Sequence, residues 1–240
     1  MKTTINTKNR SDVIFQSIGD SFFQILKYNN EITNNSLMQI RVVLKNSTIK
    51  VQNEILSFMK GDIDIKHKKV KAACFAKRLL GMDKISQKTL LSGTGEVFFR
   101  PSFKYFTIVE LEDEEIVIDD KIFYVCEGTI RITIENKDEL LVSHKTEIKL
   151  SGTGIVILSI PISEEEIIRC KLFNDKLTVA GNYAILRSGS IECNVYDFNK
   201  NIDDELKRIE VMKNYEGVGE VWLLPALSCC EEYINESAGE

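Results

Sequence analysis

Cysteine and histidine are the residue types that most often bind zinc or act as nucleophiles, and in this chain both are widely scattered. Its 240 residues include two histidines, His67 and His144, and six cysteines: Cys74, Cys126, Cys170, Cys193, Cys229 and Cys230. No two cysteines form a C-x-x-C pair, and zinc sites usually have closer ligand spacing. The sequence therefore predicts no metal site and no cofactor, and the first four cysteines are expected to be small apolar core residues.

Acidic side chains, which acid–base catalysis would need in clusters, are dispersed along the chain. Asp119, Asp120 and the run of glutamates at 164–166 look like turns and solvated edges. We therefore expect a protein that is not an enzyme. An unrecognised enzyme stays as an alternative, because side chains far apart in sequence can meet in space.

Glycine pairs of the form G-x-G occur three times and are a second candidate for chemistry, because such loops can hold phosphate. The pattern G-x-G-x-V is found in residues 92–99 (SGTGEVFF), 151–158 (SGTGIVIL) and 216–223 (EGVGEVWL). A dinucleotide loop needs a strand before it and a helix after it, whereas here an apolar strand and then a proline follow. We therefore interpret these glycines as structural: Gly93, Gly95, Gly152, Gly154, Gly217 and Gly219.

Two further strand patterns recur with the glycines. The stretches that begin at Ile49, Ile116 and Leu177 each reach a glycine twelve residues later, followed by apolar residues at every second position. A strand is also predicted at 39–44, 106–111 and 167–172. The sequence predicts an all-β fold with three pseudo-symmetric repeats (about 18–91, 92–150 and 151–225) in one domain, 12–225.

A strongly basic segment, residues 66–84, interrupts the strand patterns. Its apolar residues have helical spacing, which predicts a short insertion helix, and a second insertion helix is predicted within 199–214. The candidate partner-binding residues are Lys66, Lys68, Lys69, Lys71, Lys77 and Arg78. They form either a solvated helix face or a surface for RNA, an anionic membrane or an acidic protein.

The overall composition is that of an ordinary globular protein, with 43% apolar residues and a net charge of -5. This charge argues against attraction of the whole protein to nucleic acid or anionic lipid. No apolar run approaches the ~20 residues of a transmembrane helix, and the polar start does not look like a signal peptide. A cytoplasmic location is therefore expected, and residues 226–240 form a polar, acidic tail.

The G-x-G-x-V strands, the recurring strand–glycine–strand element and the proline after each strand resemble the altered inheritance of mitochondria protein 24 family. That family is placed in the superfamily of the tryptophan RNA-binding attenuation protein. The resemblance covers residues 18–225 and implies a double-stranded-β-helix-like or β-sandwich fold with internal threefold pseudo-symmetry, for which oligomers are plausible. None of the attenuator's site residues has a match in this chain.

Together, these features predict a binding or scaffold protein that acts through its surface on an unknown protein partner or on copies of itself. The alternatives are RNA or small-ligand binding, by superfamily analogy, and an unrecognised enzyme.

The RNA alternative makes a direct prediction about the basic segment. Replacing Lys68, Lys69 and Lys71 with Glu should abolish RNA binding, because each lysine would neutralise a phosphate. Affinity for pooled RNA should also fall by about 100-fold or more between 50 and 200 mM salt, as measured by filter binding. Absence of salt-sensitive retention of RNA would exclude this alternative.

Overall fold

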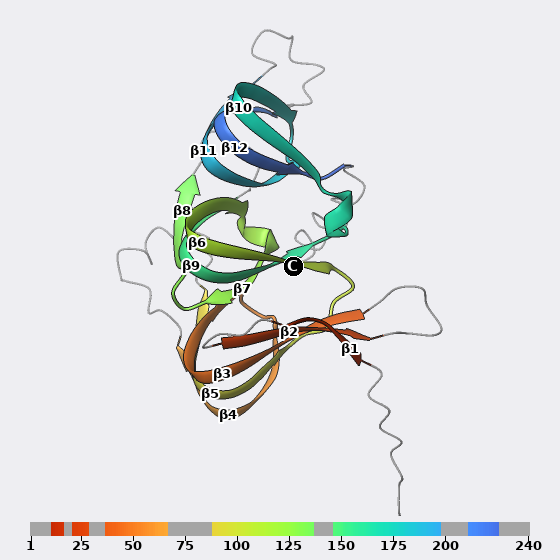
Figure 1. The fold of residues 1–240 in the computed structure, drawn as a ribbon, viewed down its shortest axis with the longest axis vertical. Helices are drawn as coiled ribbons and strands as arrows, with labels where there is room; N and C mark the ends of the chain where they lie inside the picture. The colour runs from red at the N-terminus through yellow and green to blue at the C-terminus, as the bar shows by residue number, and fades with distance from the viewer. Residues whose placement is uncertain are drawn as a thin grey trace, which may run out of the picture. The chain divides into compact units, whose positions relative to one another are not determined.

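A computed structural model describes residues 11–16, 21–28, 37–66, 88–136, 146–197 and 211–225. These residues are almost entirely β-strand, with two 3-10 turns, η1 (Asp120–Ile122) and η2 (Glu164–Glu166). The all-β prediction is confirmed (Figure 1). The strands are β1 Ser11–Gln16, β2 Ser21–Tyr28, β3 Leu37–Val51, β4 Leu56–Lys66, β5 Thr89–Phe99, β6 Tyr105–Asp119, β7 Phe123–Glu127, β8 Arg131–Asn136, β9 Glu147–Ile160, β10 Ile168–Ala180, β11 Ala184–Asp197 and β12 Val211–Leu223.

These strands form one antiparallel hydrogen-bonded sheet whose neighbours are often distant in sequence. The strand order is β1-β2-β3-β7-β9-β6-β11-β12-β10, and β5 pairs with both β3 and β4 while β8 pairs with β9. The sheet contains three groups of three strands, here called triplets. In each, the strand that comes last in the sequence pairs with the other two: β5 with β3 and β4, β9 with β6 and β8, and β12 with β10 and β11.

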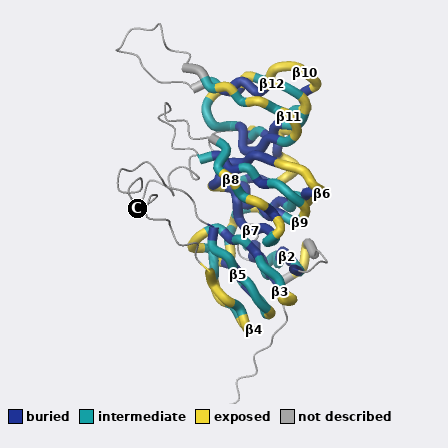
Figure 2. Tube along the Cα trace, turned by 90° about the vertical axis from the view of Figure 1, so that its left-hand side faces the viewer, coloured by how far each residue is buried: buried dark blue, intermediate teal, exposed yellow. Residues whose placement is uncertain are grey.

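The chain divides into two compact units. Unit 1 comprises Met1–Ile108, Tyr124–Gly128 and Val156–Ser159, and unit 2 comprises Val109–Phe123, Thr129–Ile155 and Ile160–Glu240. In unit 1, Ile40, Val42 and Leu44 of β3 are fully buried at every second position, as expected for a strand with one face in the core. In unit 2, a cluster around Tyr215 and Val221 of β12 forms the corresponding apolar centre. Figure 2 shows these buried segments in dark blue.

Glycine permits an unusually close approach of paired strands in each unit. Gly61 of β4 lies opposite Gly95 of β5, and Gly189 of β11 lies opposite Gly219 of β12. A Cβ atom on Gly95 would lie 2.3 Å from the carbonyl oxygen of Lys60, and one on Gly219 would lie 2.0 Å from that of Ser188. Both glycines also have positive φ (157° and 156°), so no other residue fits either position without displacing backbone.

Both predicted insertion helices are wrong where the structure describes them. Lys66 is the last residue of β4 and pairs with Leu90 of β5, because the strand ladder continues to that point. The rest of the basic segment, residues 67–84, lies outside the described residues. Met212 and Lys213, placed at the end of the second helix, belong to β12, where pairing on both sides overrides local helix propensity.

The predictions for the cysteines and for the C-terminal tail concern residues that are only partly described, or not described. Cys126 is buried in β7, and Cys170 and Cys193 are partly buried, whereas the positions of the other cysteines are not described. The tail 226–240 also lies outside. No helix in the described part of the chain is long and apolar enough to cross a membrane.

The close approach of strands at the paired glycines leads to a prediction about stability. Gly219→Ala should lower the free energy of unfolding by about 2–3 kcal/mol, because the new Cβ would collide with backbone and the positive φ would be strained. Gly181→Ala is the matched control, since Gly181 also has positive φ (58°) but has open space where a Cβ would lie. Urea unfolding should show a cost of only about 1 kcal/mol for the control. Equal losses for the two variants would contradict the close-approach account.

Candidate functional site

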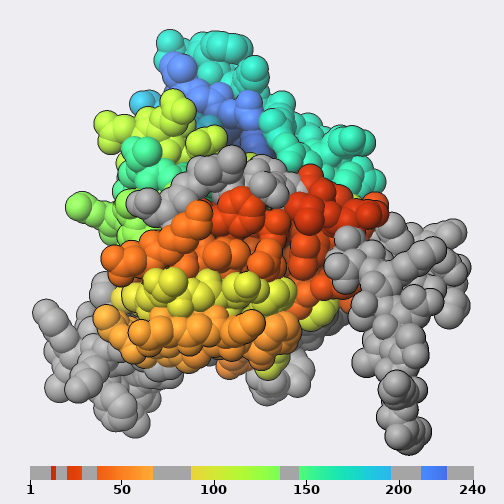
Figure 3. All heavy atoms as spheres, turned by 60° about the horizontal axis from the view of Figure 1, so that its bottom comes forward, coloured from red at the N-terminus to blue at the C-terminus, as the bar shows by residue number. Residues whose placement is uncertain are grey.

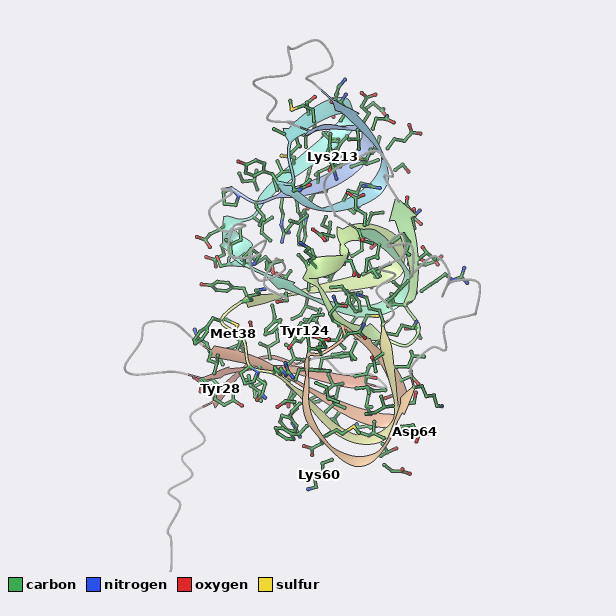
Figure 4. All side chains as sticks on the ribbon, turned by 180° about the vertical axis from the view of Figure 1, so that it is seen from behind. Tyr28, Met38, Lys60, Asp64, Tyr124 and Lys213 are labelled. Carbon is green, nitrogen blue, oxygen red and sulfur yellow. The ribbon has the colours of Figure 1, made fainter. Side chains whose placement is uncertain are left out.

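Unit 2 contains a buried cluster of three charged side chains contributed by three strands. Glu147 begins β9, Arg187 lies in β11 and Lys213 lies in β12. Arg187 Nη1 donates to Glu147 Oε2 at 2.7 Å, and Lys213 Nζ donates to Glu147 Oε1 at 3.1 Å. Figure 4 shows Lys213 on the inner side of its strand. One carboxylate therefore links two buried cations.

The charges around Glu147 determine its ionisation. Burial alone raises the pKa of this carboxyl, but the positive charges of Lys213 and Arg187 outweigh burial and hold the pKa below its usual value. Glu147 is therefore ionised at neutral pH. Charged groups at these depths are stable only when paired, so the three side chains depend on one another.

Cys193 and Tyr215 form a polar pair next to this cluster. They face each other across β11 and β12, and each side chain affects the pKa of the other. Burial and the nearby Glu147 raise the pKa of the Cys193 thiol, and burial raises the pKa of Cys126 to about 12. Both thiols stay protonated at neutral pH and are poor nucleophiles.

A recess of about 210 Å³ opens beside the cluster. Its charged lining consists of Glu115, Glu135, Lys149, Arg187 and Glu192. Lys149 Nζ lies 3.3 Å from Glu115 Oε1 and 3.4 Å from Glu135 Oε2. Burial lowers the pKa of Lys149, but its bonds and charge interactions with these two carboxylates raise it by more.

The recess favours a cationic group over an anion. Its lining has one carboxylate more than it has cations, and both Lys149 and Arg187 already have carboxylate partners. An incoming anion would have to displace one of these carboxylates. The volume is also below that of typical small-molecule pockets, which hold about 300–1,000 Å³. We therefore interpret these charged residues as an ion-pair network whose main role is structural.

Lys66 is the only candidate partner-binding residue that the structure describes, and it does not line this recess. Lys66 is exposed at the end of β4, in unit 1. Lys68, Lys69, Lys71, Lys77 and Arg78 lie outside the described residues. Among the described residues, no group of three or more His, Cys, Asp or Glu side chains could hold a metal ion.

Sequence reasoning missed the buried charges. Arg187 offered a signal, because it follows the apolar run Ala184, Ile185 and Leu186 just before the glycine of a recurring element. Lys213 offered none, since it fell in a segment predicted as helix. Glu147 contacts residues 40 and 66 positions away in sequence. These residues lie on β11 and β12, which do not pair directly with β9.

Comparison with known proteins relates the chain to one family. The model of the family described as Mitochondrial biogenesis AIM24 matches residues 30–226. A protein from Streptococcus pyogenes, whose crystal structure was determined by a structural genomics consortium, is similar in fold, with a TM-score of 0.65 and 13% sequence identity. The match covers 90% of this chain and 99% of that one. No curated protein matches the chain.

The buried cluster generates a prediction about stability and pH. Glu147→Gln removes the carboxylate that Lys213 contacts and leaves Arg187 only the longer contact to Glu135, at 3.9 Å. The free energy of unfolding at pH 7 should therefore fall by about 3 kcal/mol in urea titrations. The folded-state pKa of Glu147 is depressed, so its contribution is complete above the unfolded-state pKa and is lost as pH falls through the folded-state value. The difference between wild type and variant should therefore narrow in acid.

The control for this prediction is Glu115→Gln, since Glu115 is about half exposed and pairs only at the surface. Its cost should stay below about 0.5 kcal/mol. A Glu147→Gln variant no less stable than this control would show that the cluster is not needed for folding.

Proposed function

The chain belongs to the Mitochondrial biogenesis AIM24 family, and we propose that it is a non-enzymatic binding or scaffold protein that acts through its surface. The supporting observation is where apolar side chains are exposed. Of nine large apolar side chains exposed among the described residues, six lie on β1, β4 and β10: Val13, Ile14, Phe58, Ile65, Ile168 and Phe173. Each of these strands has a described partner strand on one side only. Edge strands that carry apolar side chains are typical of surfaces that bind other proteins.

The most exposed of these side chains is held out by a specific backbone feature. Phe173 is 75% exposed and lies opposite Val218 of β12, which is 46% exposed. A register shift follows Phe173, Asn174 has a φ of 62°, and the Asp175 carboxylate accepts a 2.7 Å hydrogen bond from the Phe173 backbone N–H. The bulge thus presents the apolar pair Phe173 and Val218 to the solvent. An exposed apolar pair favours binding to an apolar protein surface over binding to a charged partner.

The proposed scaffold consists of three repeats, and equivalent pairings in the two units support this. Residues 49–51 of β3 pair with residues 125–127 of β7 in unit 1, and residues 116–118 of β6 pair with residues 186–188 of β11 in unit 2. Both ladders are antiparallel and three residues long, and they involve positions equivalent in the sequence repeat. The repeat boundaries, the double-stranded β-helix form, the cytoplasmic location and RNA binding at the basic segment stay predictions.

The scaffold proposal predicts a specific protein contact at Phe173. A photo-reactive amino acid at position 173, in the full chain expressed in its native cells, should cross-link to a protein of defined mass. The same group at Glu165, an exposed position in η2, is the control and should give at least tenfold less of that product. Equal products at both positions, or a product that ribonuclease removes, would contradict a protein-binding role for this surface.

A further inference from the structure

The two internal three-residue ladders use the same positions relative to glycine. In each, the last residue of the second segment directly precedes a glycine: Glu127 precedes Gly128, and Ser188 precedes Gly189. The first segments, which begin at Ile49 and Ile116, start twelve residues before the glycine of their own repeat. The end of one repeat's first long strand therefore pairs with the next repeat's strand just before its glycine.

The same rule identifies two segments that have no such partner among the described residues. Residues 177–179 of β10 correspond to 49–51 and 116–118, and residues 58–60 of β4 correspond to 125–127 and 186–188. In the described structure β10 pairs with β12, and β4 pairs with β5. Figure 3 shows β4 as the outermost strand beside β5, and Figure 2 shows both β4 and β10 largely exposed.

Phe58 and Leu177 keep the apolar character of their buried counterparts but are more exposed, whereas Val179 is buried at 6%, as its counterparts Val51 and Ile118 are. Val125 is 0% exposed and Leu186 is 4% exposed, whereas Phe58 at the equivalent position is 54% exposed. Leu177 is only partly buried, although Ile49 and Ile116 are buried. Apolar side chains at an open strand edge cost solvation free energy that a matching strand would recover.

We propose that residues 177–179 of one copy pair with residues 58–60 of a second copy, as an antiparallel ladder that repeats the internal one. The register places Val179 opposite Phe58, Thr178 opposite Met59 and Leu177 opposite Lys60. The inference rests on the proposed scaffold function and names a second copy of the chain as the partner at these two edges. Because the edges differ, the contact is head-to-tail rather than twofold symmetric.

A second copy fits these edges better than an unrelated chain for a physical reason. Each edge occupies the position in the sequence repeat that its counterpart uses in an internal ladder, with an apolar residue at Phe58, Val125 and Leu186. The described residues contain one unpaired edge of each kind. Val179 would lie opposite Phe58 as Val51 lies opposite Val125 in the β3–β7 ladder. A ladder of three residues buries little surface, so the association is weak and is best detected by trapping it covalently.

Disulfide trapping tests the register directly. Met59→Cys and Thr178→Cys are made in separate chains and mixed at high concentration under mild oxidation. Residues opposite each other in an antiparallel pair have Cα atoms about 4.5–5.5 Å apart, within the range that a disulfide spans. A cross-linked dimer should form in the mixture at least tenfold more than in either variant alone or in wild type, which controls for the native cysteines. Thermal unfolding verifies that both variants fold.

A matched pair of second substitutions tests the role of the edge. Phe58→Lys added to Met59→Cys should reduce the mixed dimer at least tenfold, because it places a charge where an apolar side chain must be buried. Ile65→Lys on the same strand, also at an exposed apolar position, should leave the yield unchanged. Absence of the mixed dimer, a Met59→Cys homodimer of equal yield, or equal effects of the two lysines would overturn the proposal.

The disulfide-trapping experiment and the cross-linking experiment at position 173 can fail independently of each other. If position 173 still cross-links to its protein partner while the mixed dimer fails to form, self-association is wrong and the scaffold function stands. If the mixed dimer forms and position 173 gives no specific product, the chain assembles with itself but the Phe173 surface binds no other protein.

Discussion

The close approach of strand backbones at paired glycines is the constraint on which the described structure depends. At Gly61 with Gly95 and at Gly189 with Gly219, a side chain on either strand would meet backbone atoms of its neighbour. These close approaches allow β5 and β12 to pair along their length with strands on both sides. The pairing then fixes which side chains point inward, including Lys213 and Tyr215 on β12. Conformational freedom at a few glycines thus determines the core.

The buried charges show a second consequence of that pairing. Long antiparallel ladders bring Glu147, Arg187 and Lys213 together from separate strands. Removing charges from water is costly, and the attraction between them repays that cost only when each has a partner. The cluster therefore specifies one strand register, because a slip of one residue would turn Lys213 outward and leave Glu147 with one cation fewer.

Sequence patterns predicted the strands well and the charged site poorly. Alternating apolar residues near Gly61, Gly128 and Gly189 placed β4, β8 and β11, because a strand's period of two is a local property. Met212 and Lys213 were assigned to a helix, because their local composition gave no sign that β10 and β11 would pair with them. The cluster at Glu147 was missed for the same reason: its partners come from strand order, which a single sequence does not display.

The exposed edges connect the fold to the proposed scaffold role. An internal ladder buries Val125 and Leu186, whereas their third counterpart, Phe58, is 54% exposed. Among the described residues, one edge of each kind therefore lacks a partner strand. Amide hydrogen exchange at residues 58–60 and 177–179, measured at low and at high protein concentration, tests this account most directly. We predict that exchange slows at both segments as concentration rises, while exchange at the exposed residues of η2 does not change. Equal exchange rates at both concentrations would show that the edges stay open and would contradict the account.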